Sequence, residues 1–300
     1  MWFKNLVIYR LQQWDISLPA LEEKLARSAL QPCAGLDMQS RGWVAPKGDN
    51  EPLVHVFGSQ MLIRLGIEKK LLPATVITQF AKARALDIEE QQGYKPGRKQ
   101  MKEIKEAVTD ELLPRAFAIR RKTSVWIDPV AGWMVVDAAN VGRADEVIEM
   151  LHKTLDNIAF APVMTAVSPV SAMTGWLSGN SISASFTIDQ DCELRSRSES
   201  AATVRYVRHT LEDEEVKKHI KSGKEVTRLG LTWANRISFV LHENLQLKRI
   251  TPLDLIRDIA AEHEQDDAFD TDFALMTGEF NQLLPALIDI LGGAAQKSAS

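Results

Sequence analysis

The 300-residue sequence has little of what marks several common protein classes. It has two cysteines, Cys33 and Cys192, far apart in the chain, which excludes a disulfide framework and predicts a reducing compartment. Its formal net charge is −4, so no overall basic excess indicates a nucleic-acid binder. It lacks a signal-peptide pattern and any run of about 18 consecutive apolar residues. We therefore expect a cytoplasmic protein without a membrane span.

Catalytic and metal-binding motifs are also scarce. The six histidines show no HExxH spacing, residues 93–99 depart from the Walker A pattern, and Ser178 is displaced from the centre of a GxSxG motif. One acidic cluster could bind Mg²⁺ for phosphodiester cleavage; it comprises Glu262, Glu264, Asp266, Asp267, Asp270, Asp272 and Glu279. A solvated surface explains it better, because adjacent like charges usually face water. We predict a protein that is not an enzyme and has no metal or cofactor, with a metal-dependent nuclease as the alternative.

The hydrophobic pattern predicts an α+β fold with two α+β lobes and a projecting helical insert. The central lobe is expected over 1–72 and 123–160, the helical tip insert over 73–122, and a second lobe with C-terminal helices over 161–300. Within the first two, we expect strands at 4–11 and 53–67, a β-hairpin at 124–136, and helices at 17–30, 73–113 and 143–158. Gly93 to Gly97 should interrupt the insert as a helical hairpin turn.

The second lobe should begin after an uncharged connector. We expect strands at 181–186, 203–209, 226–232 and 236–241, a helix at 214–222, and two helices that start at Thr251-Pro252. Arg64-Leu65-Gly66-Ile67 is similar to Arg228-Leu229-Gly230-Leu231, although four residues are too few to establish a duplication.

Positive charge is concentrated in the insert. Residues 93–122 contain nine basic and four acidic residues, a local net charge of +5. In a helix, Arg98, Lys99, Lys102 and Lys105 would fall on one arc of about 120°. Met101, Ile104 and Val108 would fall on another arc. The basic stripe suits a phosphate backbone, and an ordinary solvated helix face explains it equally well.

A second basic group comprises Arg195, Arg197, Arg205 and Arg208, with Tyr206 and His209 interleaved. In a strand, Arg205 and His209 would share one face, and Tyr206 and Arg208 the other. Phosphate contact and ion pairing with the acidic residues 212–215 are both open. Because no base-reading motif is present, any nucleic-acid binding should be nearly independent of sequence.

Ordered landmarks along the whole chain resemble the bacterial RdgC family of recombination-associated proteins. They are Trp2-Phe3-Lys4-Asn5-Leu6, Tyr9-Arg10-Leu11, Pro32-Cys33, Gly42-Trp43-Val44, Leu112-Leu113-Pro114-Arg115-Ala116-Phe117, Trp126-Ile127-Asp128, Leu275-Met276-Thr277-Gly278-Glu279 and Gly292-Gly293. The resemblance implies a ring-shaped homodimer that encircles double-stranded DNA. It also implies nucleoid association, no catalysis, and antagonism of RecA by occupation of its DNA.

The resemblance also suggests roles for individual residues. Phe117 corresponds to the family's tip phenylalanine and would be the dimer gate, while Arg208 with His209 corresponds to basic positions of the second lobe. Together with the charge pattern, the candidate DNA-binding residues are Lys95, Arg98, Lys99, Lys102, Lys105, Arg115, Arg120, Arg121, Lys122, Arg205, Arg208 and His209. Single-stranded DNA is a second candidate target. An inhibitor that contacts the recombinase directly is a further alternative.

Overall fold

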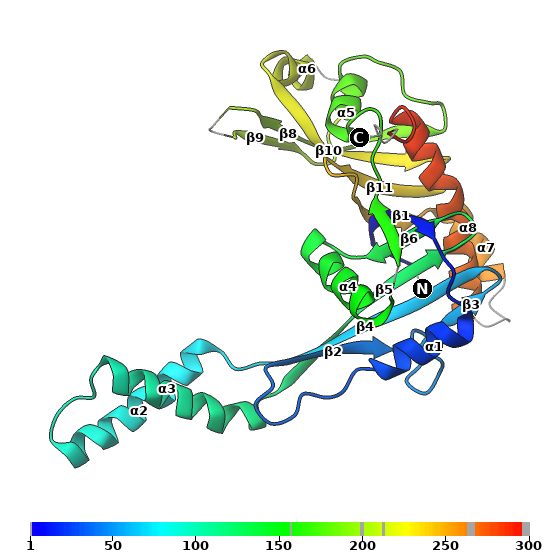
Figure 1. The fold of residues 1–300 in the computed structure, drawn as a ribbon. Coiled ribbons are helices and arrows are strands. Elements are labelled where there is room, and N and C mark those ends of the chain that lie inside the picture. The colour runs from blue at the N-terminus through cyan, green and yellow to red at the C-terminus, as the bar shows by residue number, and fades with distance from the viewer. Residues whose placement is uncertain (1, 157, 199–200, 212–213, 263–267, 296–300) are drawn as a thin grey trace, which may run out of the picture.

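The computed structural model describes residues 2–156, 158–198, 201–211, 214–262 and 268–295 (Figure 1). Within them, 12 strands form one antiparallel sheet in the order β2-β4-β5-β6-β1-β12-β11-β10-β8-β9, with β3 beside β4 and β7 beside β1. The strands are β1 (Asn5–Gln13), β2 (Gln39–Val44), β3 (His55–Phe57), β4 (Gln60–Lys70), β5 (Ala118–Asp128), β6 (Trp133–Asp137), β7 (Ala159–Pro162), β8 (Phe186–Ser196), β9 (Thr203–Tyr206), β10 (Lys224–Trp233), β11 (Ile237–His242) and β12 (Leu247–Pro252). The two expected lobes therefore share a single sheet.

The two halves of the sheet are built in similar ways. Outward from β1, one side runs β6, β5, β4 and β2, and the other runs β12, β11, β10 and β8. The similar tetrapeptides lie on the corresponding strands β4 and β10. In each, the glycine allows a neighbour to pack closely: a Cβ on Gly66 would lie 2.8 Å from the side chain of Val44, and one on Gly230 would lie 3.1 Å from Asp189. The short sequence repeat thus marks a repeated arrangement of strands.

Helices cover both faces of the first half of the sheet. On one face, α1 (Leu18–Arg27) and α4 (Val141–Thr154) pack Leu21 and Val147 against β4 residues such as Ile63. On the other face lies α8 (Ala268–Ile290), whose Phe280 ring is 6.0 Å from the Trp126 ring of β5. Where α8 packs, these strands therefore carry apolar residues on both faces, such as Leu62 and Ile63 of β4.

Helices cover only one face of the second half. The helices α5 (Pro169–Leu177), α6 (Glu214–Lys221) and α8 pack Met173, Val216 and Leu284 against Leu229 and Leu231 of β10. In the part of the chain that the structure describes, no helix packs on the opposite face of these strands, which faces the concave side of the molecule (Figure 1). We call it the bare face.

A helical hairpin extends from the first half of the sheet. β4 and β5 pair from Met61 and Ile127 to Lys70 and Ala118, and their continuations carry α2 (Ala74–Gln92), α3 (Arg98–Leu112) and the short helix η1 (Leu113–Arg115). Figure 1 shows an open C, with this hairpin at one end and β8 and β9 at the other. The concave side holds α4 and the bare face. None of the described helices has the length and apolar character needed to cross a membrane.

Most expected elements form, including the helical hairpin, and three expectations about the second half are wrong. The strand expected at 181–186 begins only at Phe186, because its small polar residues are mostly exposed and Ser183 and Ser185 bond to each other at 3.0 Å. Thr251 and Pro252 end β12, and α7 (Asp254–Glu262) starts two residues later. The strand expected at 203–209 stops at Tyr206.

Candidate nucleic-acid interface

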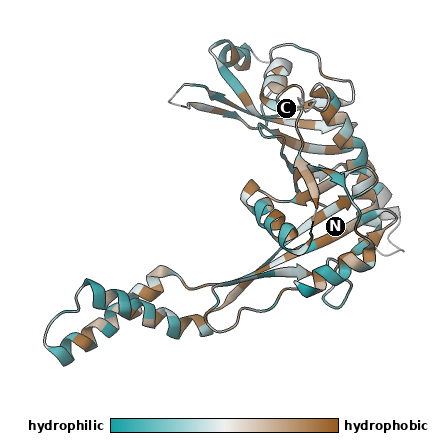
Figure 2. Ribbon diagram, in the orientation of Figure 1, coloured by the Kyte–Doolittle hydropathy of each residue, from teal (hydrophilic) through white to brown (hydrophobic). Residues whose placement is uncertain are grey.

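The hairpin presents cations to solvent because its apolar residues face inward. Ala81 of α2 packs against Ile104 and Val108 of α3, and all three are buried. The predicted apolar arc of α3 is therefore confirmed. The predicted basic residues Lys95, Arg98, Lys99, Lys102 and Lys105 are all exposed. Figure 2 shows the far end of the hairpin as mostly hydrophilic.

Few of these hairpin cations are neutralised by a neighbour. The ammonium of Lys102 lies 3.6 Å from the carboxylate of Glu106, one turn away, and such exposed pairs contribute little. Across the described ranges, Lys95, Arg98, Lys99 and Lys105 form no ion pair. Their charged groups are thus available to an external anion.

The predicted cations at the base of the hairpin are mostly engaged already. Three are paired with carboxylates: Arg120 with Glu68 (2.5 Å), Arg121 with Glu146 (2.5 Å) and Lys122 with Asp49 (3.4 Å). A backbone hydrogen bond from Cys33, together with Arg120, lowers the pKa of Glu68, so this pair is charged at neutral pH. Arg115 is exposed and has no ion pair among the described residues. Of this group, Arg115 is the most readily available to a phosphate.

Phe117 lies where the hairpin rejoins β5, and its side chain is 85% exposed. Its carbonyl accepts a 2.7 Å hydrogen bond from the backbone N–H of Leu71, which fixes the main chain while the ring faces solvent. Leu71 and Ile119 beside it are also exposed. The structure thereby excludes a core role for Phe117. A cluster of exposed apolar side chains of this kind is typical of a protein-interaction site.

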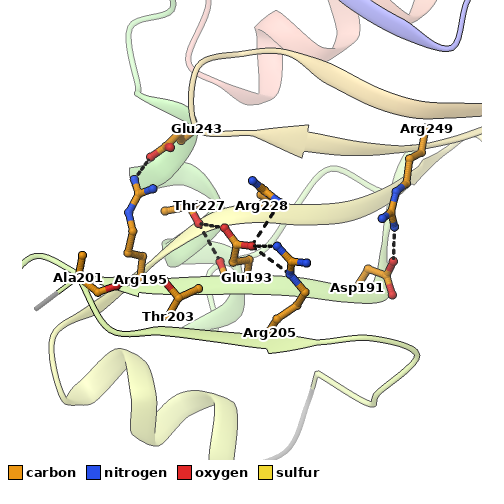
Figure 3. Close-up of polar contacts among 10 residues, drawn as sticks. All are labelled: Asp191, Glu193, Arg195, Ala201, Thr203, Arg205, Thr227, Arg228, Glu243 and Arg249. Carbon is orange, nitrogen blue, oxygen red and sulfur yellow. Dashed lines mark hydrogen bonds and ion pairs between the residues drawn. The ribbon is translucent and has the colours of Figure 1, made fainter. Parts of the chain in front are cut away.

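The bare face contains a second set of charged side chains (Figure 3). Because alternate residues of a strand point to opposite faces, Cys192 and Leu194 of β8 join the core while Asp191, Glu193 and Arg195 lie on the bare face. The cations of this face are Arg195, Arg205, Arg228, Lys248 and Arg249. It is therefore rich in cations, which come from the four strands β8, β9, β10 and β12.

Glu193 is the centre of this network. Its side chain is 8% exposed, and Oε2 accepts a 3.0 Å hydrogen bond from Nε of Arg205 and lies 3.3 Å from a guanidinium nitrogen of Arg228. The hydroxyl of Thr227 donates to Oε1 at 3.2 Å. Burial raises the pKa of Glu193, but the Arg205 hydrogen bond and the charge of Arg228 outweigh it and lower the pKa overall. The carboxylate therefore stays ionised and holds two arginines side by side.

A pocket of about 290 Å³ opens on the bare face, with Arg228, His242 and Lys248 among its lining residues. Burial lowers the pKa of His242 to about 4, and the charges of Lys248 and Arg228 add to the shift. Burial and Arg228 also lower the pKa of Lys248. Burial is the main cause of both shifts, and the smaller contributions of Arg228 and Lys248 are those of neighbouring cations, which favour an anion.

The structure corrects the expected geometry of the basic residues after β9. Because β9 ends before Arg208 and His209, the prediction that Arg205 and His209 share a strand face is wrong. Arg208 takes a left-handed backbone conformation (φ 53°), and its backbone N–H donates to Asp191 at 3.1 Å. This turn exposes the Arg208 side chain, which forms no ion pair within the described segments.

The remaining two residues of this group have contacts of their own. A ring nitrogen of His209 lies 2.9 Å from the carbonyl of Thr210. Arg205 was expected to contact phosphate or the acidic residues 212–215, and its carboxylate partner in the structure is Glu193. Among the described residues of this basic group, only Arg208 therefore presents to solvent a guanidinium without a carboxylate partner.

Two of the acidic residues considered for a metal site, Asp270 and Glu279, are engaged by separate cations. Asp270 lies 3.1 Å from the ammonium of Lys47, and Glu279 accepts a 2.8 Å hydrogen bond from Arg236. Glu264, Asp266 and Asp267 lie outside the described residues, as does the side chain of Glu262. Among the described side chains, no three His, Cys, Asp or Glu residues lie close enough to hold a metal ion. The nuclease alternative therefore finds no support in this geometry.

The sequence reasoning missed Arg228, His242, Lys248 and Arg249. The sequence does indicate that Arg228 is exposed. Polar and apolar residues alternate over 228–232, which places Arg228 and Thr232 on one face of a strand and Leu229 and Leu231 on the other. The alternation could not show that this solvent-exposed side faces the concavity.

One family of proteins matches this chain over almost its whole length. A family model described as "Putative exonuclease, RdgC" matches residues 1–294. The chain belongs to the RdgC family. Proteins named recombination-associated protein RdgC from Janthinobacterium sp. (strain Marseille) and Herminiimonas arsenicoxydans are 56% and 55% identical to it, covering 99% of this chain and 100% of each relative. The protein of that name from Bordetella pertussis is 55% identical over 98% of this chain and 99% of its own.

The resemblance inferred from the sequence is thus confirmed, and it places the chain among proteins associated with recombination. The RdgC family model's description mentions an exonuclease, whereas the names of these relatives refer to recombination and to no catalytic activity.

Proposed function

We propose that this RdgC-family chain is a non-catalytic protein that binds double-stranded DNA without sequence preference and encircles it as a ring-shaped homodimer. By occupying DNA, it restrains RecA-mediated recombination in the cytoplasm, at the nucleoid. The observation that supports this most is the C-shaped fold, which has the bare face on its concave side and the cationic hairpin at one end (Figure 1).

The types of contact available support binding to the DNA backbone. Phosphate oxygens are bound by Arg and Lys without regard to sequence, whereas base reading needs side chains that enter a groove. The hairpin cations stand on an exposed helix and the bare-face cations on a broad, open sheet. Such a surface follows the phosphates of a duplex, and a single strand would also satisfy it.

Ring closure requires a second copy of the chain. In a two-fold dimer the same patch meets itself, so the exposed Phe117 would pack against the partner's equivalent residue. Burial of an exposed Phe side chain contributes about 1.5–3 kcal/mol, so this contact could open and close. The gate would admit DNA without dissociation of the rest of the dimer.

Encirclement is tested with closed circular duplex and the same DNA linearised, each challenged with high salt in the presence of Mg²⁺. We expect complexes on circles to survive the challenge and complexes on linear DNA to slide off the ends. Equal loss from both substrates would reduce the proposal to a surface-bound basic patch. Cut circles would revive the nuclease.

Substitution of Lys102 and Arg208 by Glu separates occupancy from direct contact with the recombinase. If the protein acts by occupying DNA, the variant loses DNA binding and RecA inhibition together. An inhibitor that contacts the recombinase would keep inhibition after DNA binding is lost.

A further inference from the structure

The arginines of the bare face are neutralised by carboxylates that lie beside them on the same sheet. The pairs are Arg195 with Glu243, Arg205 and Arg228 with Glu193, and Arg249 with Asp191 (Figure 3). The exposed hairpin cations Lys95, Arg98, Lys99 and Lys105 differ, since none of them has an ion-pair partner in the described part of the chain. A DNA phosphate could bind these sheet arginines only in competition with the protein's own carboxylates.

Glu193 is the strongest of these internal competitors. It is nearly buried and engages two guanidinium groups at once, whereas Glu243 is well exposed and engages one. A carboxylate and a phosphate bind the same planar fork of an arginine, so they exclude each other from it. The lowered pKa of Glu193 keeps the competitor charged at neutral pH.

We propose that Glu193 limits how tightly the bare face holds DNA, by occupying Arg205 and Arg228 in place of a backbone phosphate. The inference rests on the proposed function, and it adds a regulator of affinity within the same surface. Two partly exposed arginines remain close enough to reach a passing phosphate, yet each contact must first displace an internal partner. This exchange gives the weak hold that lets a protein move along DNA.

The test is the variant Glu193→Gln, which keeps the shape of the side chain and removes its charge. Because Arg205 and Arg228 are both substantially exposed, the variant leaves no buried cation unpaired. Release of one net positive charge should steepen the slope of log K against log salt by about 0.9. The ratio of variant to parent affinity for duplex DNA should therefore be about 8-fold larger at about 0.1 M salt than at about 1 M. A folded variant that binds as the parent does, or more weakly, overturns the proposal.

The control is Glu279→Gln, which makes the same change at the nearly buried Glu279 of α8, whose partner is the partly buried Arg236 in the turn between β10 and β11. It should leave the slope unchanged. A second variant, Glu243→Gln, keeps the proposal testable if Glu193→Gln does not fold. It frees Arg195 and should also tighten DNA binding, by a smaller factor. An unchanged Kd would count against the proposal. If the parent protein shows no salt-dependent DNA binding, the proposed function itself fails. If the parent binds and both variants are unchanged, only the role of Glu193 fails.

Discussion

Replacement of Arg98, Lys99 and Lys105 by glutamine should make DNA binding much less dependent on salt. All three are exposed on α3 and have no ion pair within the described residues, so each is free to displace a condensed counterion from a phosphate. Glutamine has nearly the same helix propensity as Lys and Arg, and none of the three side chains belongs to the core of the hairpin. The variant should therefore fold normally.

The magnitude follows from the number of free cations. Each phosphate contact contributes about −0.9 to the slope of log K against log salt, so three contacts contribute about −2.7 when one hairpin lies on the duplex. Between 50 and 200 mM salt, a slope of about 2.7 corresponds to a factor of about 40 in Kd. The salt-induced loss of affinity should be smaller by this factor in the triple variant than in the parent.

The assay is fluorescence anisotropy of a labelled duplex across a salt series. The matched control replaces Lys217, Lys218 and Lys221 of α6 by glutamine, which removes the same charge from a helix that packs on the covered side of the sheet. The control should keep the slope of the parent. Equal slopes for parent and hairpin variant would refute the assignment of α3 to the DNA interface.

Three other outcomes can be checked. Phe117→Ala should change the free energy of unfolding by no more than about 0.5 kcal/mol, because the ring is 85% exposed, yet abolish salt-resistant retention on circular DNA. Folding lowers the pKa of His242 from 6.5 to about 4, so the unfolded state binds more protons than the folded state between these pH values. The free energy of unfolding should therefore drop by about 2 kcal/mol as the pH falls from 6.5 to 4. His242→Gln should remove this part of the pH dependence in urea titrations. Gly42→Ala should destabilise by about 3 kcal/mol in thermal melts, since its Cβ would lie 2.3 Å from the backbone nitrogen of Leu30, whereas Gly278→Ala, in open helical space, should stabilise by about 0.5–1 kcal/mol.

The hairpin illustrates what local pattern can predict. Its two helices, the turn at Gly93 and the apolar arc of Ile104 and Val108 follow from periodicity and turn residues, which act over a few neighbouring positions. Phe117 was singled out through the family resemblance, and the structure adds that its ring faces solvent. Its role as a dimer gate stays a prediction.

The bare face illustrates what local pattern misses. Glu193 meets Arg205 and Arg228 across three neighbouring strands, and these partners are 12 and 35 residues away in the sequence. Strand pairing and a shifted register between β8 and β10 decide which side chains meet. The direction of Arg208 depends on a left-handed turn that strand alternation does not predict.

The sequence by itself determined the amphipathic helices, the alternation of most strands, the cationic hairpin and the family. These features depend on residues within one or two turns of each other, or on landmarks spread along the whole chain. Only the tertiary structure decided that the chain forms one sheet, that α8 covers one side of its second half, and that the other side stays bare. Each of these outcomes depends on which apolar surfaces find one another over long separations, and no local stretch of sequence contains that information.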